Sequence, residues 1–118
     1  ACGGGEFLYL AQSSGWQVEG IEPGRDFARY AREEYGVPIL SGFIAEAAFP
    51  PAHFDAVTLW HALEHVDDPV GILERLGSWL AASGRLIVEV PNVLATCQAP
   101  RQRYHRAHLY HFNAVTLT

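Results

Sequence analysis

Residues 2–23 read CGGGEFLYLAQSSGWQVEGIEP, and their pattern indicates the type of fold. The glycines lead into Glu6 to Ser14, where apolar residues at helical spacing predict a helix that ends at Gly15. The segment Trp16 to Glu22 predicts a short strand with a carboxylate at its end. Because a glycine loop at a helix N-terminus lets a ligand approach free backbone N–H groups, the stretch predicts a ligand site in a layered α/β fold.

The alternation of helix and strand continues along the rest of the chain. The Asp68-Pro69 start signal and the Ser83-Gly84 stop signal bound a predicted helix, whose apolar face is Val70, Leu73, Leu76 and Leu80. A further helix is predicted over 25–35, and strands over 37–40, 54–60 and 85–90. This order predicts a Rossmann-like parallel sheet with helices on both faces, in three layers, with ligands at the carboxyl ends of the strands.

Composition bounds the class of protein. The 118 residues (13.0 kDa) fit a single domain, and 49% hydrophobic residues exclude a disordered chain. A net charge of -5 counts against nucleic acid as the main partner. No apolar run approaches the roughly 20 residues needed to span a bilayer. Cys2 and Cys97 are too few for a disulfide framework, so a reduced, cytoplasmic protein is expected.

Both ends of the sequence have the composition of interrupted elements. The chain begins on a glycine run with nothing before it, and residues 113–118 resemble the start of a helix. We therefore expect a single partial domain, 1–118, whose first strand and final strands are missing.

Glu22 and the glycine loop predict a nucleoside ligand. A carboxylate nineteen residues after Gly3 can accept hydrogen bonds from both hydroxyls of a ribose. The dinucleotide fingerprint needs a third glycine where Leu8 stands, and no Lys or Arg lies near the loop to balance a phosphate. An adenosine ligand without phosphate fits better, although a dinucleotide-binding oxidoreductase domain of the NAD type stays open as an alternative.

The motifs, taken together, resemble the class I S-adenosylmethionine-dependent methyltransferases, in the small-molecule branch that includes ubiquinone-biosynthesis enzymes. The resemblance covers almost the whole chain, in the family's order and spacing. The segments that carry it are CGGGEFL (2–8), GIEP (20–23), FDAV (54–57), HALEHV (61–66) and GRLIVEVPN (84–92).

The resemblance implies S-adenosylmethionine as cofactor, with S-adenosylhomocysteine as product. It implies that the cofactor-binding residues are Cys2, Gly3, Gly5, Glu22, Pro23, Gly42, Phe43, Ile44, Trp60 and His65. The chain departs from the family in having Ala1 where the loop starts with glycine. It also has no acidic residue after the third strand unit until Glu46.

The histidines admit two interpretations. The resemblance places residues 93–118 on the acceptor side, and His61, His108 and His111 are candidate general bases if the acceptor is a hydroxyl. The pattern His61-x-x-Glu64-His65 also matches inverted zinc peptidases. The methyltransferase pattern explains the same residues without a metal, so no metal site is expected.

The expected function is transfer of a methyl group from S-adenosylmethionine to an oxygen, nitrogen or carbon atom of a small molecule. A methyltransferase-like domain without catalysis is the further alternative. The expected partner is the small-molecule acceptor, with no nucleic acid and no membrane span. A homo-oligomer, in which a second chain supplies a strand, is compatible with the sequence.

Overall fold

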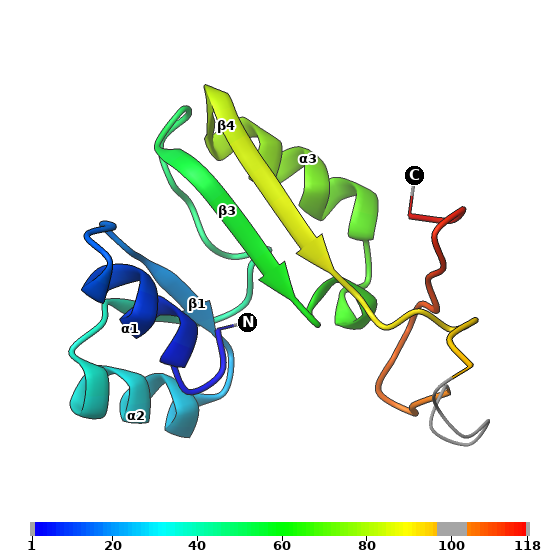
Figure 1. The fold of residues 1–118 in the computed structure, drawn as a ribbon, viewed down its shortest axis with the longest axis horizontal. Helices are drawn as coiled ribbons and strands as arrows, with labels where there is room; N and C mark the ends of the chain where they lie inside the picture. The colour runs from blue at the N-terminus through cyan, green and yellow to red at the C-terminus, as the bar shows by residue number, and fades with distance from the viewer. Residues whose placement is uncertain (1, 97–103, 118) are drawn as a thin grey trace. The chain divides into compact units, whose positions relative to one another are not determined.

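The computed structural model describes residues 2–96 and 104–117, which form two compact units, Ala1–Phe49 and Pro50–Thr118 (Figure 1). Cys97 lies outside the described residues. We refer to the two parts as the N-terminal unit and the C-terminal unit.

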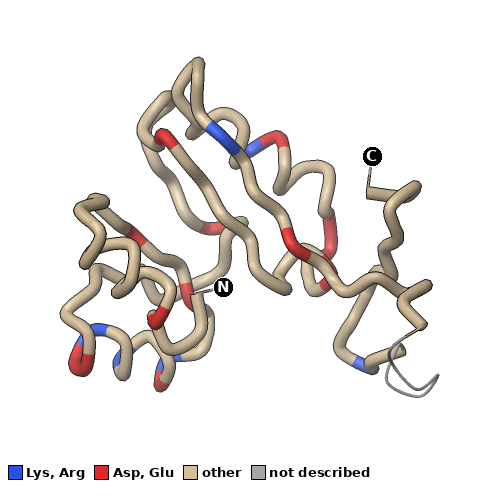
Figure 2. Tube along the Cα trace, in the orientation of Figure 1, with Lys and Arg blue, Asp and Glu red and all other residues tan. Residues whose placement is uncertain are grey.

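The N-terminal unit is a parallel strand pair with its helices. The elements are α1 (Glu6–Ser13), β1 (Gly20–Glu22), α2 (Arg25–Tyr35) and β2 (Ile39–Ser41). β1 and β2 run parallel, with Gly20 opposite Ile39 and Glu22 opposite Ser41. The helix α2 packs on both strands and contributes Ala28 and Ala31 to the buried core, while its outer face carries charges of both signs (Figure 2).

The sequence predicts this unit closely. The helix α2 has the predicted bounds, because Gly36 ends it in the left-handed conformation, and α1 ends one residue before the predicted end. The strand β1 is shorter than predicted. The Trp16 amide bonds to Ala11 in the turn after α1, and the Trp16 side chain is exposed, so pairing with β2 begins only at Gly20.

The C-terminal unit contains the second parallel pair. Its elements are β3 (Phe54–Trp60), the 3₁₀ turn η1 (Leu63–His65), α3 (Pro69–Trp79) and β4 (Leu80–Glu89). The strand β3 has the predicted bounds, and Trp60 at its end lies opposite Glu89 of β4. Asp68 caps α3 as predicted, since its carboxylate accepts a hydrogen bond from the Gly71 amide.

The predicted end of α3 is wrong. The helix stops at Trp79 instead of Ser83-Gly84, because Leu80 is already extended and pairs with Phe54 of β3. A register shift between Phe54 and Ala56 then accommodates the residues before Arg85. The buried face is also displaced from the predicted one: it consists of Ile72, Leu76 and Trp79, while Val70 is exposed.

The strand pairing is parallel throughout the described part of the chain, as predicted, but the single predicted sheet is found as two strand pairs, one in each unit. Within residues 2–96 and 104–117, every helix is too short or too polar to cross a membrane.

Candidate functional site

Glu22 is the centre of the site in the N-terminal unit. Its residue is only 6% exposed, although it lies at the end of β1. The Gly3 amide donates a hydrogen bond to Glu22 Oε2 at 2.9 Å, and the Gly24 amide donates to Glu22 Oε1 at 2.9 Å. The carboxylate therefore ties the glycine loop to the strand end, which the sequence did not indicate.

Backbone contacts fix the loop further. The Cys2 amide bonds to the Ile21 carbonyl at 3.0 Å, and the Gly5 amide bonds back to the Cys2 carbonyl at 3.1 Å. Burial, followed by the charge of Glu22, raises the pKa of the Cys2 thiol, so this side chain is a packing group. These contacts hold the loop in one conformation beside β1.

The site can accommodate the ribose of a nucleoside cofactor. A carboxylate offers about four acceptor positions, so both oxygens of Glu22 can still accept a hydroxyl after bonding to the two amides. A Cβ placed on Gly3 would meet no atom of the described residues within 4 Å, so the loop backbone is open there. Glu22 and the glycine loop therefore fit the ribose of a nucleoside cofactor.

The turn after β2 contacts the main chain of Glu22. The Gly42 amide bonds to the Glu22 carbonyl at 3.1 Å, and the Phe43 side chain is exposed. Glu46 folds back so that its Oε2 accepts from the Phe43 amide at 3.3 Å. Glu46 comes later in the sequence than the acidic residue that the family has after this strand. The turn nevertheless brings its carboxylate back to the Phe43 amide. Ile44 belongs to the same turn, and Pro23 follows β1 with its side chain exposed.

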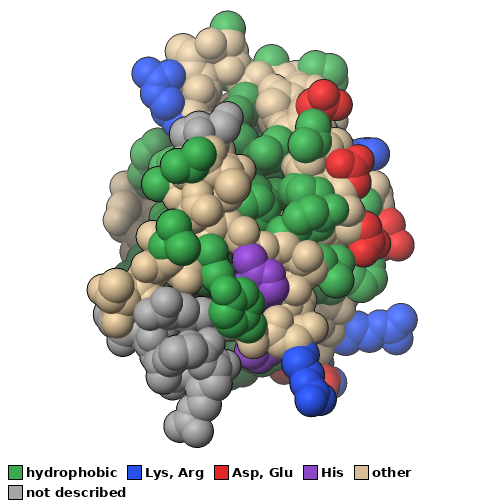
Figure 3. Space-filling model, turned by 90° about the vertical axis from the view of Figure 1, so that its right-hand side faces the viewer, with side chains coloured by type: hydrophobic (Ala, Val, Ile, Leu, Met, Phe, Trp, Pro, Cys, Tyr) green, Lys and Arg blue, Asp and Glu red, His purple; other side chains and the backbone are tan. Residues whose placement is uncertain are grey.

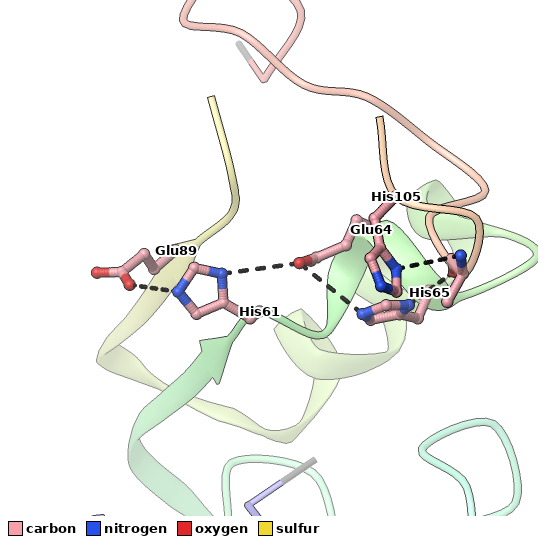
Figure 4. A network of polar contacts seen from close by, with 6 residues as sticks. His61, Glu64, His65, Glu89 and His105 are labelled. Carbon is pink, nitrogen blue, oxygen red and sulfur yellow. Dashed lines mark hydrogen bonds and ion pairs between the residues drawn. The ribbon is translucent and has the colours of Figure 1, made fainter. Parts of the chain in front are cut away.

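A second cluster occupies the C-terminal unit, at the carboxyl ends of β3 and β4 (Figure 4). His61 directly follows Trp60 and adopts φ 48°, a left-handed conformation that is rare outside glycine. Its amide bonds to the Glu89 carbonyl at 2.9 Å, and its Nε2 lies 2.9 Å from Glu89 Oε1. The polar contacts at Glu89 thus compensate the strained backbone.

Glu64 is the most unusual residue of this cluster. It is 1% exposed, and within the part of the chain that the structure describes neither carboxylate oxygen has a hydrogen-bond partner. His61 Nδ1 lies 3.7 Å and His65 Nε2 lies 4.0 Å from Oε1, both beyond hydrogen-bond distance. A buried carboxylate without hydrogen bonds is costly.

His65 has a defined tautomer when neutral. Its Nδ1 lies 2.8 Å from the Ala107 carbonyl oxygen, which can only accept, so Nδ1 carries the proton and Nε2 keeps its lone pair. The Ala107 amide in turn donates to His105 Nδ1 at 3.2 Å (Figure 4). Residues 105–107 are thereby positioned against η1.

The remaining histidines line up along the same segment. The ring of His108 lies 4.9 Å from that of His65 and 6.0 Å from that of His111, measured between centroids. Burial lowers the pKa of His108, partly opposed by the charge of Glu64. Figure 3 shows histidine side chains open to solvent and bordered by hydrophobic side chains.

The predicted site residues therefore fall into two groups. The structure joins Cys2, Gly3, Glu22 and Gly42 in the N-terminal unit, and His65, His108 and His111 in the C-terminal unit. His61 is linked to His65 through Glu64. Sequence reasoning missed Glu89, whose signal is its place at the end of a strand after an apolar run. The zinc-peptidase arrangement is not formed, because His61 precedes a single 3₁₀ turn and does not share an α-helix with His65.

A parallel α/β framework with a glycine loop tied to an acidic strand end defines a nucleoside-cofactor-binding domain. A family model described as "Methyltransferase domain" matches residues 1–118. The chain belongs to this family, in the class I S-adenosylmethionine-dependent group that its motifs resemble, which confirms the predicted family.

The relatives agree with this assignment. The "Ubiquinone biosynthesis O-methyltransferase" of Xylella fastidiosa is 30% identical over 100 residues, covering 77% of this chain and 39% of the relative. The protein of that name from Aeromonas salmonicida is 32% identical over 97 residues, covering 77% and 41%. The chain thus spans about two fifths of the length of these curated relatives.

A solved structure has the same fold. The "SAM dependent methyltransferase from Archaeoglobus fulgidus" superposes with a TM-score of 0.83 at 22% identity, over 98% of this chain and 53% of that one. The predicted Rossmann-like fold class is thereby confirmed.

Proposed function

We propose that the protein to which this chain belongs transfers a methyl group from S-adenosylmethionine to a small-molecule acceptor. The observation that carries the proposal is the buried carboxylate of Glu22, held by two amides at the end of β1 beside an open glycine loop. The family match over the whole chain supports the same cofactor.

In this proposal the N-terminal unit holds the donor. S-adenosylmethionine supplies an electrophilic methyl group on a sulfonium sulfur. Glu22 accepts the ribose hydroxyls, and the loop at Cys2, Gly3 and Gly5 presents its backbone to the adjoining part of the ligand. The exposed ring of Phe43, with Pro23, Gly42 and Ile44 nearby in sequence or in the same turn, forms the adenine side.

The C-terminal unit serves the acceptor side. Residues 93–118 would orient the acceptor for in-line attack, and alignment of this kind supplies most of the rate. Trp60, at the end of β3, and His65, in η1, stay predicted cofactor contacts. The base role of His61, His108 and His111 stays a prediction. Because the curated relatives are named O-methyltransferases, we propose an oxygen atom as the methylated position.

The proposal also covers the cellular compartment of the protein and the partners it binds. The acidic composition and the small number of cysteines support a cytoplasmic enzyme that does not bind nucleic acid. The charge near the loop also favours a ligand without phosphate over a dinucleotide, because Glu6 lies in the first turn of α1 and would repel a pyrophosphate.

Calorimetric titration with S-adenosylhomocysteine tests this proposal. We expect Glu22→Ala to weaken binding by at least about tenfold, since a hydrogen bond to a charged group contributes roughly 1.5–3 kcal/mol. Glu33→Ala, on an exposed position of α2, is the matched control and should bind normally. Binding of NAD in preference to S-adenosylhomocysteine would overturn the proposal in favour of the dinucleotide alternative.

A ligand change separates the two roles of Glu22. If the carboxylate holds the ribose, wild-type protein should bind S-adenosylhomocysteine more tightly than its 2′-deoxy analogue, and Glu22→Ala should lose this preference. A carboxylate that only anchors the loop would leave the preference unchanged. Circular dichroism would confirm that the variant is folded.

A further inference from the structure

The carboxylate of Glu64 has no partner within the described residues that would justify its burial. It is 1% exposed, and both oxygens lack a hydrogen bond. The side chain is nonetheless aimed at histidines: its Oε1 lies 4.0 Å from His65 Nε2, too far for a hydrogen bond but close enough for both atoms to bind a common ion. A buried carboxylate beside imidazole nitrogens in this way offers the donor types of a metal-binding site.

Two imidazoles complete the donor set. His65 points its unprotonated Nε2 inward, because its Nδ1–H donates to the Ala107 carbonyl at 2.8 Å. A backbone carbonyl on the outer nitrogen is the usual support of a metal-binding histidine. His108 reaches the same point from the C-terminal segment, and the donor atoms of Glu64, His65 and His108 all lie within 4.8 Å of one another.

We propose that Glu64, His65 and His108 bind one divalent transition-metal ion of the Zn²⁺ type. One carboxylate and two neutral imidazoles suit Zn²⁺ better than Mg²⁺, which prefers oxygen ligands. Zn²⁺ bonds of about 2.1 Å in tetrahedral geometry separate ligand atoms by about 3.4 Å, so the three groups move together by about an ångström on binding.

The proposed site is accessible to an ion from solvent on the side of His65. The side chain of His65 is 42% exposed, so the ion can enter from solvent and keep a water molecule in its fourth position. His61 Nδ1 lies 3.7 Å from Glu64 Oε1, and Glu89 orients the His61 ring from the other side. This inference goes beyond the proposed methyl transfer and does not depend on it, and it differs from the expectation, drawn from the resemblance, that the chain has no metal site.

Titration with Zn²⁺ alone, against a colorimetric chelator, tests the site in the full chain. We expect one Zn²⁺ per chain, with affinity lowered at least about tenfold in His108→Ala and in Glu64→Gln. His53→Ala removes an exposed histidine that precedes β3 and should leave the affinity unchanged. Co²⁺ in place of Zn²⁺ should give the visible absorption of a tetrahedral site in wild type and lose it in His108→Ala.

Two results would overturn the proposal. Wild type that binds Zn²⁺ no more tightly than His108→Ala has no such site. Equal affinity in wild type and in Glu64→Gln would show that Glu64 is not a ligand and that the ion is held by histidines alone. Since Glu64 is buried and its variant can fail to fold, His65→Ala, at an exposed position, serves the same purpose and must also weaken binding.

Discussion

At the scale of single residues, the Cys2 thiol reports on the state of the glycine loop. Burial, followed by the charge of Glu22, raises the pKa of this thiol above its ordinary value. Because folding favours the protonated thiol, its contribution to stability is complete below the ordinary thiol pKa and is lost as the pH rises through the raised value.

We therefore expect Cys2 to react slowly with iodoacetamide at neutral pH, with a rate that rises only at a pH above that of a free cysteine. Peptide mass spectrometry would assign the label to Cys2. Bound S-adenosylhomocysteine should slow the reaction further if the loop lines its site. A rate that rises at or below the pH found for free cysteine would contradict the burial seen here.

The contacts of the site were predictable to different degrees. The spacing of nineteen residues between Gly3 and Glu22 predicted a carboxylate beside the glycine loop, but not the hydrogen bond between the Gly3 amide and Glu22. The pairing of His61 with Glu89 depends on the register of β3 against β4, and that of His65 with Ala107 depends on how a segment without periodicity folds back. Neither has a local signal in the sequence.

At the scale of elements, the turn into α1 requires glycine at position 5. Gly5 has φ 89°, and a Cβ there would lie 2.7 Å from the Ala31 Cβ of α2. Gly36, at the end of α2, also has a positive φ (64°), but a Cβ there would meet no described atom within 4 Å. A comparison of alanine substitutions at the two positions therefore separates the cost of backbone strain from the cost of steric overlap.

We expect Gly5→Ala to lower the free energy of unfolding by about 1–3 kcal/mol more than Gly36→Ala, since both share the cost of left-handed backbone and only the first overpacks the core. Urea denaturation followed by circular dichroism measures both. Equal losses would mean that α1 shifts to make room beside Ala31.

The N-terminus of α3 gives a second test. Asp68 accepts the Gly71 amide at 3.0 Å, and Pro69 occupies the first helical position. Asp68→Ala should lower the free energy of unfolding by about 1 kcal/mol, the usual contribution of such a cap. Asp67→Ala, one residue earlier and exposed, is the control and should change it much less; a similar loss in both would remove the capping role.

Elements were predicted well where a local signal ends them. Gly36 ends α2 and the Pro50-Pro51 break precedes β3, and both elements have their predicted bounds. The boundary between α3 and β4 was misplaced because strand pairing overrides the turn signal at Ser83-Gly84: Leu80 gains a partner in Phe54 as soon as it leaves the helix. Tertiary pairing of this kind is invisible in a local pattern.

At the scale of the whole chain, the C-terminal segment (residues 104–117) is held on the C-terminal unit mainly by backbone hydrogen bonds. The amides of Leu109 and Tyr110 both bond to the Glu64 carbonyl, at 2.8 and 3.3 Å, and the Val93 amide bonds to the Phe112 carbonyl at 2.9 Å. The Tyr110 hydroxyl adds one side-chain contact, donating to the Asp67 carbonyl at 2.9 Å.

Removing that hydroxyl should loosen the segment without detaching it. A hydrogen bond contributes about 1 kcal/mol, so Tyr110→Phe should raise the exchange rates of the Leu109 and Tyr110 amides with deuterium by roughly fivefold or less. Tyr104→Phe, an exposed tyrosine in the same segment, should leave them unchanged. Unchanged exchange in both variants would show that the Tyr110 hydroxyl does not help to hold the segment.

Docking through main-chain atoms has a consequence for evolution. The amide and carbonyl groups that hold residues 109–112 are the same in every amino acid except proline, whereas the side chains of Leu109, Tyr110 and His111 are exposed. Mutation at Leu109 and His111 can therefore exchange what this segment displays while its main-chain contacts are inherited unchanged. A library randomised at these two positions should stay largely folded, so that new ligand preferences can be selected without first repairing the scaffold.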